Sequence, residues 1–296
     1  MDIARLGLEV RSDGVVVATK RLRQLEQQSG RADGAVARMA RAVKGALAGV
    51  AIAAAAAFGG QARYDEGPEV VYGIEQEQHA VASYYRNTII HFFVNKAIIE
   101  LAMVKTSEFE GNAALEVFWS EVDKLRDLFK FEFFYAPTEL FHQQIREELG
   151  RYSGDWEQLL QQGQSGFLRL QGNMLLLAAH VTLLTYAEAY SVVADLLARL
   201  DEWESLSEAD CVAQALKLGH QAYLQRRISS PASIGKLLFK NGFRMAQHRQ
   251  LTEGGGKEVA RGRKALSMEI RDVLQRLELI RAIGVAARAS SVEAEA

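Results

Sequence analysis

Cysteine and proline are scarce in this sequence, and each scarcity narrows the possible fold. Cys211 is the only cysteine, so one chain can form neither a disulfide framework nor a thiolate metal cluster. This suits a reducing compartment, and we expect a cytoplasmic protein. Only three prolines occur among 296 residues, while Ala, Leu, Glu, Gln and Arg are abundant, which favours an all-helical body.

Apolar runs of membrane-spanning length are missing too. The Ala-rich segment 46–58 has 13 residues, short of the roughly 20 that cross a bilayer. The most buried-looking segment, residues 173–200, contains Glu188 and Asp195, and charged side chains are costly at bilayer depth. We therefore expect any contact with the cell membrane to be peripheral, on its inner face.

Motifs of several functional classes are absent as well. The sequence has no Gly-rich phosphate loop, no His/Cys/Asp metal spacing and no Ser-nucleophile elbow. Its Lys and Arg residues match no nucleic-acid-binding fold. We expect no metal, no cofactor and no nucleic-acid partner.

The net charge of −2 hides an asymmetry along the chain. Residues 1–63 contain ten Lys/Arg and five Asp/Glu, which leaves 25 basic and 32 acidic residues for the remainder. Within residues 1–63, apolar positions 6, 8 and 10 alternate with others, Ser12-Asp13-Gly14 signals a turn, and alternation resumes at 15 and 17. This pattern predicts a β-hairpin, followed by a polar helix and the Ala-rich helix.

That N-terminal order resembles the start of phage tail tape-measure proteins. The resemblance offers an alternative function, a structural piece of a phage tail or a fusion of such a start with an unrelated helical region. The junction would lie near residues 59–64.

The stretch 84–101 combines a broad apolar helix face with a polar edge. Ile90, Val94, Ile98 and Leu101 recur at helical spacing, which predicts a helix from about residue 76 to 105. The polar edge consists of Arg86, Asn87 and His91. Such an edge is typical either of the wall of an anion-binding pocket or of an ordinary helix start.

Further apolar periodicities predict a helical bundle for residues 64–251. We predict helices over 115–129, 138–149, 173–200 and 207–226, others that begin at Trp156 and at Ser230-Pro231, and a loop over 163–172 with a short strand at 167–170. Residues 253–256 are predicted to be a flexible Gly linker, before an amphipathic helix with apolar positions Leu266, Ile270, Val273, Leu277 and Ile280 and a disordered tail from Ala289.

The predicted fold class is therefore mostly α, a multi-helix bundle with a short N-terminal β-hairpin followed by a helix. The predicted domains are 1–63, 64–251 and 252–296. An aromatic cluster, Phe131, Phe133, Phe134 and Tyr135, is either a membrane-interface anchor or part of the core, and we favour the core.

The strongest electrostatic feature is a run from Arg226 to Arg249 without an acidic residue. Within it Lys236, Lys240, Arg244 and His248 are spaced four apart and predict one cationic stripe on a helix. Asn241-Gly242 is a potential break in that helix. The run could bind anionic lipid headgroups or phosphates, or it could be a solvated face, and the candidate anion-binding residues are Arg86, Asn87, His91, Arg226, Arg227, Lys236, Lys240 and Arg244.

Four stretches of the chain, taken in order, resemble one protein family. They are YYRNTIIHFFVNKAIIELA (84–102), LRDLFKFEFFYAPTELFHQQIREEL (125–149), HVTLLTYAEAYSVVADLL (180–197) and AYLQRRISSPASIGKLLFKNGFRMA (222–246). They are similar to the bacterial glycerol-3-phosphate 1-O-acyltransferase family in its actinobacterial form, over about residues 65–251, at and beyond the end of the catalytic domain. The resemblance implies acyl transfer from acyl-CoA or acyl-carrier donors to sn-glycerol 3-phosphate in phospholipid biosynthesis.

Two motifs of that family are missing from this chain. The family's H-x4-D motif supplies a general-base His and an orienting Asp, but none of the six histidines is followed by Asp five positions on. The F-P-E-G phosphate-binding motif is absent too, because the three prolines lie in Gly-Pro-Glu, Ala-Pro-Thr and Ser-Pro-Ala. We therefore expect no acyl transfer by this chain alone, and we interpret it as a lipid- or partner-binding helical module.

Overall fold

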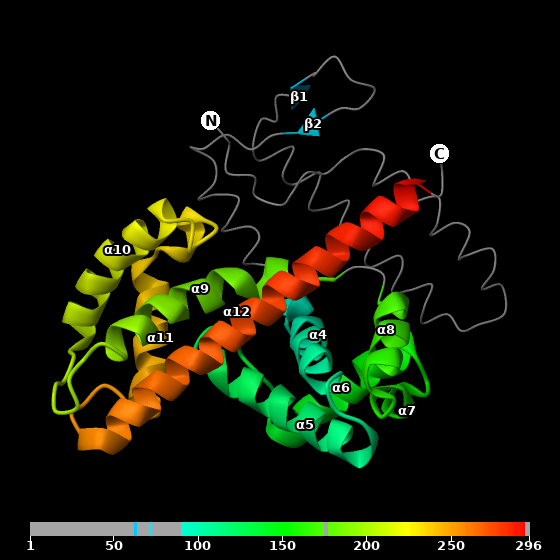
Figure 1. Ribbon diagram of the computed structural model, residues 1–296, viewed down its shortest axis with the longest axis horizontal. Helices are drawn as coiled ribbons and strands as arrows, with labels where there is room; N and C mark the ends of the chain where they lie inside the picture. Colours follow the sequence, from blue (N-terminus) through cyan, green and yellow to red (C-terminus); the bar gives the residue numbers. More distant parts are fainter. Residues whose placement is uncertain (1–61, 64–70, 73–89, 175–176, 294–296) are drawn as a thin grey trace. The chain divides into compact units, whose positions relative to one another are not determined.

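The computed structural model of the chain is almost entirely helical and describes residues 62–63, 71–72, 90–174 and 177–293. Its elements are β1 (Ala62–Arg63), β2 (Val71–Tyr72), η2 (His91–Phe93), α4 (Val94–Thr106), α5 (Gly111–Leu128), α6 (Thr138–Tyr152), α7 (Trp156–Leu160), α8 (Gly163–Asn173), α9 (Ala179–Leu197), α10 (Glu208–Leu224), η3 (Pro231–Ser233), α11 (Lys236–His248) and α12 (Gly256–Glu293) (Figure 1). The mostly α prediction is confirmed. The hairpin predicted over residues 6–17 lies outside the described residues.

Residues 88–296 form one compact unit, and residues 1–87 form another. In the latter, β1 and β2 pair antiparallel, with Ala62 opposite Tyr72 and Arg63 opposite Val71. The boundary predicted near residue 63 is not tested by this short ladder and stays a prediction.

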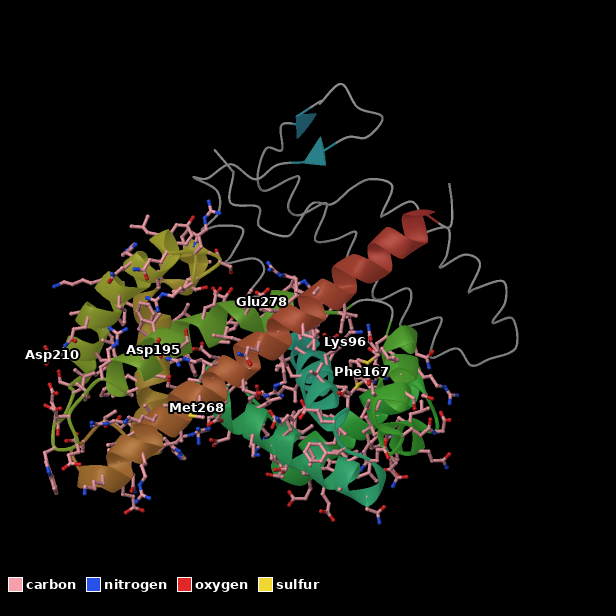
Figure 2. The ribbon with its side chains drawn as sticks, viewed as in Figure 1. Lys96, Phe167, Asp195, Asp210, Met268 and Glu278 are labelled. Atoms are coloured by element: carbon pink, nitrogen blue, oxygen red, sulfur yellow. The ribbon has the colours of Figure 1, made fainter. Side chains whose placement is uncertain are left out.

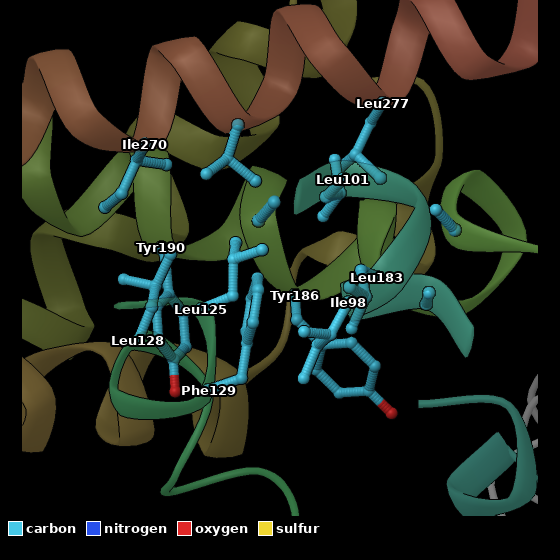
Figure 3. Close-up of a cluster of buried hydrophobic side chains, with 14 of the residues drawn as sticks. Ile98, Leu101, Leu125, Leu128, Phe129, Leu183, Tyr186, Tyr190, Ile270 and Leu277 are labelled. Carbon is cyan, nitrogen blue, oxygen red and sulfur yellow. The ribbon is translucent and has the colours of Figure 1, made fainter. Parts of the chain in front are cut away.

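Helix α9 lies at the centre of the helical unit, and α4, α10, α11 and α12 pack around it (Figure 1). Buried side chains cover most of its circumference, as its apolar sequence predicts. Figure 3 shows the resulting core, where α4, α5, α9 and α12 meet through Ile98, Leu101, Leu125, Leu128, Phe129, Leu183, Tyr186, Tyr190, Ile270 and Leu277.

The two acidic residues of α9 are both used within the protein. The carboxylate of Asp195, labelled in Figure 2, accepts hydrogen bonds from Ser267 Oγ (2.9 Å) and Arg271 Nη2 (2.8 Å) of α12. Glu188 accepts hydrogen bonds from Ser229 and Ser233, in the connection that precedes α11. Among the described helices, none has the combined length and apolarity that crossing a bilayer requires.

Helix α9 starts at Ala179, later than the predicted residue 173, because a side chain from α4 caps it there. The buried carboxylate of Glu100 accepts the backbone N–H groups of Ala178 (2.9 Å to each oxygen) and Ala179 (2.7 Å). These donors have no partner within the helix, so the carboxylate satisfies them. The predicted apolar positions Val94, Ile98 and Leu101 are buried in α4, and Ile90, just before η2, is buried as well.

The loop before α12 is firmly held, whereas the Gly-rich sequence 253–256 predicted a flexible linker. Gly255 N and Gly256 N donate to the Glu202 carbonyl at 3.1 and 2.9 Å. The guanidinium of Arg263, which is fully buried, donates to the carbonyls of Leu251 (2.8 Å), Asp201 (3.0 Å), Glu204 (2.7 Å) and Glu253 (3.1 Å). The five predicted apolar positions of α12 are buried, so this helix belongs to the same core.

Three other predictions are corrected by the structure. Residues 163–173 form helix α8, where we predicted a loop with a strand, because Phe167 and Leu170 are buried at helical spacing. Ser230-Pro231 starts only the short η3, and α11 begins separately at Lys236. Helix α12 continues to Glu293, through most of the tail for which we predicted disorder from Ala289.

The aromatic cluster that follows α5 is divided between core and surface. Phe133 is buried, and Phe131 and Tyr135 are partly buried against the core, as we favoured. Phe134 is fully exposed, which the core interpretation did not predict.

Candidate anion-binding site

The candidate site is built at the connection between α10 and α11. Helix α10 ends in a Schellman motif, in which Arg227 N donates to the Ala222 carbonyl (2.8 Å) and Arg226 N donates to the Tyr223 carbonyl (2.9 Å). This motif requires a left-handed residue, and Arg226 takes that position with φ of 58°. The backbone therefore turns sharply and leaves the side chains of Arg226 and Arg227 exposed.

A carboxylate from α9 fixes the remainder of the connection. Glu188 accepts a hydrogen bond from Ser229 N (2.7 Å) and another from Ser233 Oγ (2.5 Å). Burial raises the pKa of Glu188, and these hydrogen bonds partly offset the rise. Ser230 caps η3 by accepting from Ala232 N at 3.1 Å. The connection is thus a rigid platform on the bundle.

Helix α11 is continuous through Asn241-Gly242, where we identified a potential break. Gly242 is buried, and a Cβ added there would lie 3.2 Å from Tyr190 Cδ1 and 3.3 Å from Val193 Cγ2. Glycine is used at this position for close approach of α11 to α9. Lys236, Lys240, Arg244 and His248 therefore do lie on one helix.

Two of the stripe's cations, Lys240 and Arg244, are compensated by an acid from another helix, while His248 contacts a further cation. Glu208, at the start of α10, forms ion pairs with Lys240 (2.7 Å) and Arg244 (3.7 Å). The ring nitrogens of His248 lie 3.0 and 3.1 Å from Lys130 Nζ. The uncompensated part of the stripe is therefore shorter than the sequence predicts. The prediction did not count Glu208 because this residue lies outside the acid-free run.

The uncompensated cations lie beside the connection, together with two exposed leucines. Among the described ion pairs none involves Arg226, Arg227 or Lys236, although Arg227 Nε donates to Gln225 Oε1 (3.0 Å). Leu224 ends α10 and is 81% exposed, and Leu237 lies in the first turn of α11 and is 67% exposed. We call Leu224, Arg226, Arg227, Lys236 and Leu237 the basic–apolar tip.

The packing of α10 on α11 supports the treatment of these residues as one surface. A Cβ added to Gly219 would lie 3.1 Å from Phe239 Cζ and 3.5 Å from Ile234, so the two helices touch close to the connection. We missed the two leucines in the sequence. Leu237 could have been found because it falls outside the buried stripe of Phe239, Gly242, Phe243 and Ala246.

The other predicted site residues do not join the tip. Arg86 and Asn87 lie outside the described residues. His91 is exposed in η2, and its ring centroid lies 4.0 Å from that of Phe92. No hydrogen bond or ion pair between described residues links His91 to α10 or α11. Its part in an anion site stays a prediction.

Comparison with known proteins supplies the family. The model of the glycerol-3-phosphate acyltransferase C-terminal region matches residues 19–254. A protein of Mycobacterium bovis and its counterparts in two strains of Mycobacterium tuberculosis, which carry the name acyltransferase plsB1, are each 34% identical over 220 residues. The alignment covers 73% of this chain and 35% of each relative, so the chain spans about a third of their length. No solved structure matches the chain.

The family match has a bearing on the predicted two-part origin of the chain. It starts at residue 19, inside the segment 1–63 whose pattern resembles tape-measure proteins. That resemblance, and a junction near residue 63, stay predictions. Over most of its length, the chain belongs to the glycerol-3-phosphate acyltransferase family and corresponds to the C-terminal region of that family.

Proposed function

We propose that this chain is a non-catalytic, lipid-docking module of the acyltransferase family. Its basic–apolar tip binds the surface of an anionic membrane, with Arg226, Arg227 and Lys236 at the headgroups and Leu224 and Leu237 among the upper acyl chains. The observation that carries the proposal is the combination of uncompensated cations and exposed leucines on one rigid connection.

The energies expected for such a surface are those of reversible docking. A Lys or Arg near an anionic bilayer contributes about 1 kcal/mol, so three contribute about 3 kcal/mol. A fully buried leucine contributes about 1.5–3 kcal/mol, and partial insertion contributes less. The tip alone therefore gives weak, salt-sensitive binding, suited to placing a protein at a membrane that a second contact also holds.

The conformation of Arg226 supports a use for its side chain. Glycine is the residue usually found at the left-handed position of a Schellman motif, and a side chain there costs about 1 kcal/mol. Strained positions of this kind concentrate at functional sites. The exposed guanidinium has no structural partner among the described residues that would account for this cost.

The relation to acyl transfer rests on the family. Members act, as their name states, on glycerol 3-phosphate, and the chain covers about a third of the length of the relatives it matches. Because the H-x4-D and F-P-E-G motifs are missing, we propose that acyl transfer to sn-glycerol 3-phosphate depends on a catalytic part outside this sequence. Acyl-CoA and glycerol 3-phosphate are then substrates of that part. Turnover of acyl-CoA by the pure chain, dependent on glycerol 3-phosphate, would contradict this proposal.

Vesicle flotation with matched charge reversals tests the docking. The test variant carries Arg226→Glu, Arg227→Glu and Lys236→Glu. The control carries Lys257→Glu, Arg261→Glu and Lys264→Glu, three exposed cations near the start of α12. We expect the full chain and the control to float with phosphatidylglycerol vesicles at low salt and the test variant to remain at the bottom. Equal flotation of both variants contradicts the proposal.

A further inference from the structure

A partly buried carboxylate, with its Oε1 shielded from solvent, lies where the segment after α5 meets α9 and α11. Glu132 is in the segment between α5 and α6, and its Oε2 accepts a hydrogen bond from Asn241 Nδ2 of α11 at 3.2 Å. Asn241 precedes Gly242, which packs against Tyr190 of α9. The hydroxyl of Tyr190 in turn lies close enough to the carboxylate to affect the pKa of Glu132. One acid therefore contacts α11 and its packing partner together.

The polar atoms around this carboxylate are poorly satisfied. Glu132 Oε1, Tyr135 Oη and Tyr190 Oη are all shielded from solvent, and none forms a hydrogen bond of standard geometry with the described residues. Buried polar atoms in native proteins are nearly always paired, so such a concentration requires an explanation. These three atoms belong to groups that interact with one another electrostatically.

The cationic side chains near Glu132 interact with other groups. Arg126 Nη2 donates to the Ala136 carbonyl at 2.9 Å, and its guanidinium lies over the rings of Tyr135 (5.9 Å) and Phe141 (5.4 Å). Lys130 pairs with Asp127 at 2.7 Å and with His248. Among the described ion pairs none neutralises Glu132. An ionised Glu132 would thus be a largely desolvated anion with one amide hydrogen bond and a tyrosine hydroxyl nearby.

We propose that Glu132 is a proton-operated latch for α11. With the proton bound, the neutral acid lets α11 sit closely against α9 and the segment after α5. With the proton lost, the buried charge is relieved when α11 and this segment separate enough to admit water. The groups that face the acid are Tyr135 from its own segment, Tyr190 from α9 and Asn241 from α11, with Arg126 of α5 acting through Tyr135.

The size of the effect follows from proton linkage. Burial raises the pKa of Glu132 from its ordinary 4.5 to about 7, and the hydrogen bond from Asn241 and the nearby hydroxyl of Tyr190 limit the rise. If opening returns the acid to its ordinary pKa, the opening equilibrium increases about tenfold between pH 6 and pH 8. This change lies in the physiological range and does not depend on lipid binding by the tip.

Amide hydrogen exchange of the full chain tests the latch. We expect protection factors in α11, corrected for the intrinsic pH dependence of exchange, to fall about tenfold from pH 6 to pH 8. Glu132→Gln should abolish this fall. The matched control is Glu100→Gln, which removes another acid of pKa about 7 that caps α9 and has no described contact with α11. In the control the fall in α11 should persist.

A second variant distinguishes a change in the protonation of Glu132 from a general loss of structure. Tyr190→Phe keeps the ring and removes the hydroxyl that favours the charged acid, so it should move the midpoint of the α11 transition to higher pH. Protection in α11 that is independent of pH in the wild type, or a pH dependence that survives Glu132→Gln, overturns the proposal.

Discussion

Arg276 of α12 donates to Glu121 of α5 at 2.6 Å, and both side chains are buried. The same guanidinium donates through Nη1 to the Leu101 carbonyl of α4 at 3.0 Å. One side chain thus connects three helices that are distant in sequence. Because the pair is removed from solvent, breaking it leaves a charge without compensation.

Replacing Arg276 should be among the most costly single changes in the helical unit. We expect Arg276→Ala to lower the free energy of unfolding by about 3–5 kcal/mol, measured by urea denaturation. The control is Arg281→Ala, which removes an exposed partner of Glu278 and should cost less than about 1 kcal/mol. Similar losses for the two variants would show that the buried pair has no special role.

Stability should decrease as the pH rises, because Glu100 binds a proton more tightly when the protein is folded. Burial raises its pKa from 4.5 to about 7, above the unfolded value. Its contribution is therefore fully present below about pH 4.5 and is lost as the pH rises through 7. We expect Glu100→Gln to reduce the loss of unfolding free energy between pH 5 and pH 8 by roughly 2–3 kcal/mol. An unchanged difference between the two pH values in urea titrations would contradict this.

Replacing Arg263 with lysine should destabilise the protein. Four of the five N–H groups of Arg263 donate to four carbonyls around the loop before α12, and lysine, a point donor, cannot reproduce that planar fork. We expect Arg263→Lys to destabilise the protein by about 2 kcal/mol or more, since buried carbonyls lose their partners. Hydrogen exchange of residues 251–256 reports the local effect, and preserved protection there would show that the loop is held by other contacts.

Arg226→Gly should separate stability from function. Glycine accepts the left-handed backbone of the Schellman motif without strain, so the free energy of unfolding should rise by up to about 1 kcal/mol. Vesicle binding should weaken because one headgroup cation is lost. Thermal unfolding and flotation of the same preparation measure both changes. Weakened stability together with unchanged binding would refute both parts.

Local patterns predicted the helices well where apolar periodicity was strong. Ile98 and Leu101 in α4, and Ile270 and Leu277 in α12, are buried as their spacing indicates. The loop predicted over residues 163–172 was wrong, because the glycines of this segment suggested a loop and the structure has a helix. There, Gly166 permits contact with the backbone of Leu159, for a Cβ would lie within 1.6 Å of its carbonyl oxygen. No sequence pattern within the segment predicts that contact.

Long-range pairing explains what the sequence could not predict about the site. The acid-free run suggested a full cationic stripe, but Glu208 reaches Lys240 and Arg244 from the preceding helix. The basic–apolar tip could be identified only from the structure, where Leu224 and Leu237 have large exposed fractions. Similarly, the partners of Arg263 are backbone carbonyls, which every residue type has, so the sequence could not predict them.

Site-specific fluorescence at the tip tests the central claim, membrane docking, most directly. The native Cys211 is fully buried, and burial raises the pKa of its thiol to about 12, so it should react slowly with a thiol probe. An environment-sensitive probe can therefore be placed selectively through Leu237→Cys, with Lys264→Cys as the control. We predict a blue shift on mixing with phosphatidylglycerol vesicles at position 237, reversed by high salt, and no shift at position 264. An unshifted probe at position 237, or equal shifts at both positions, would contradict docking through the tip.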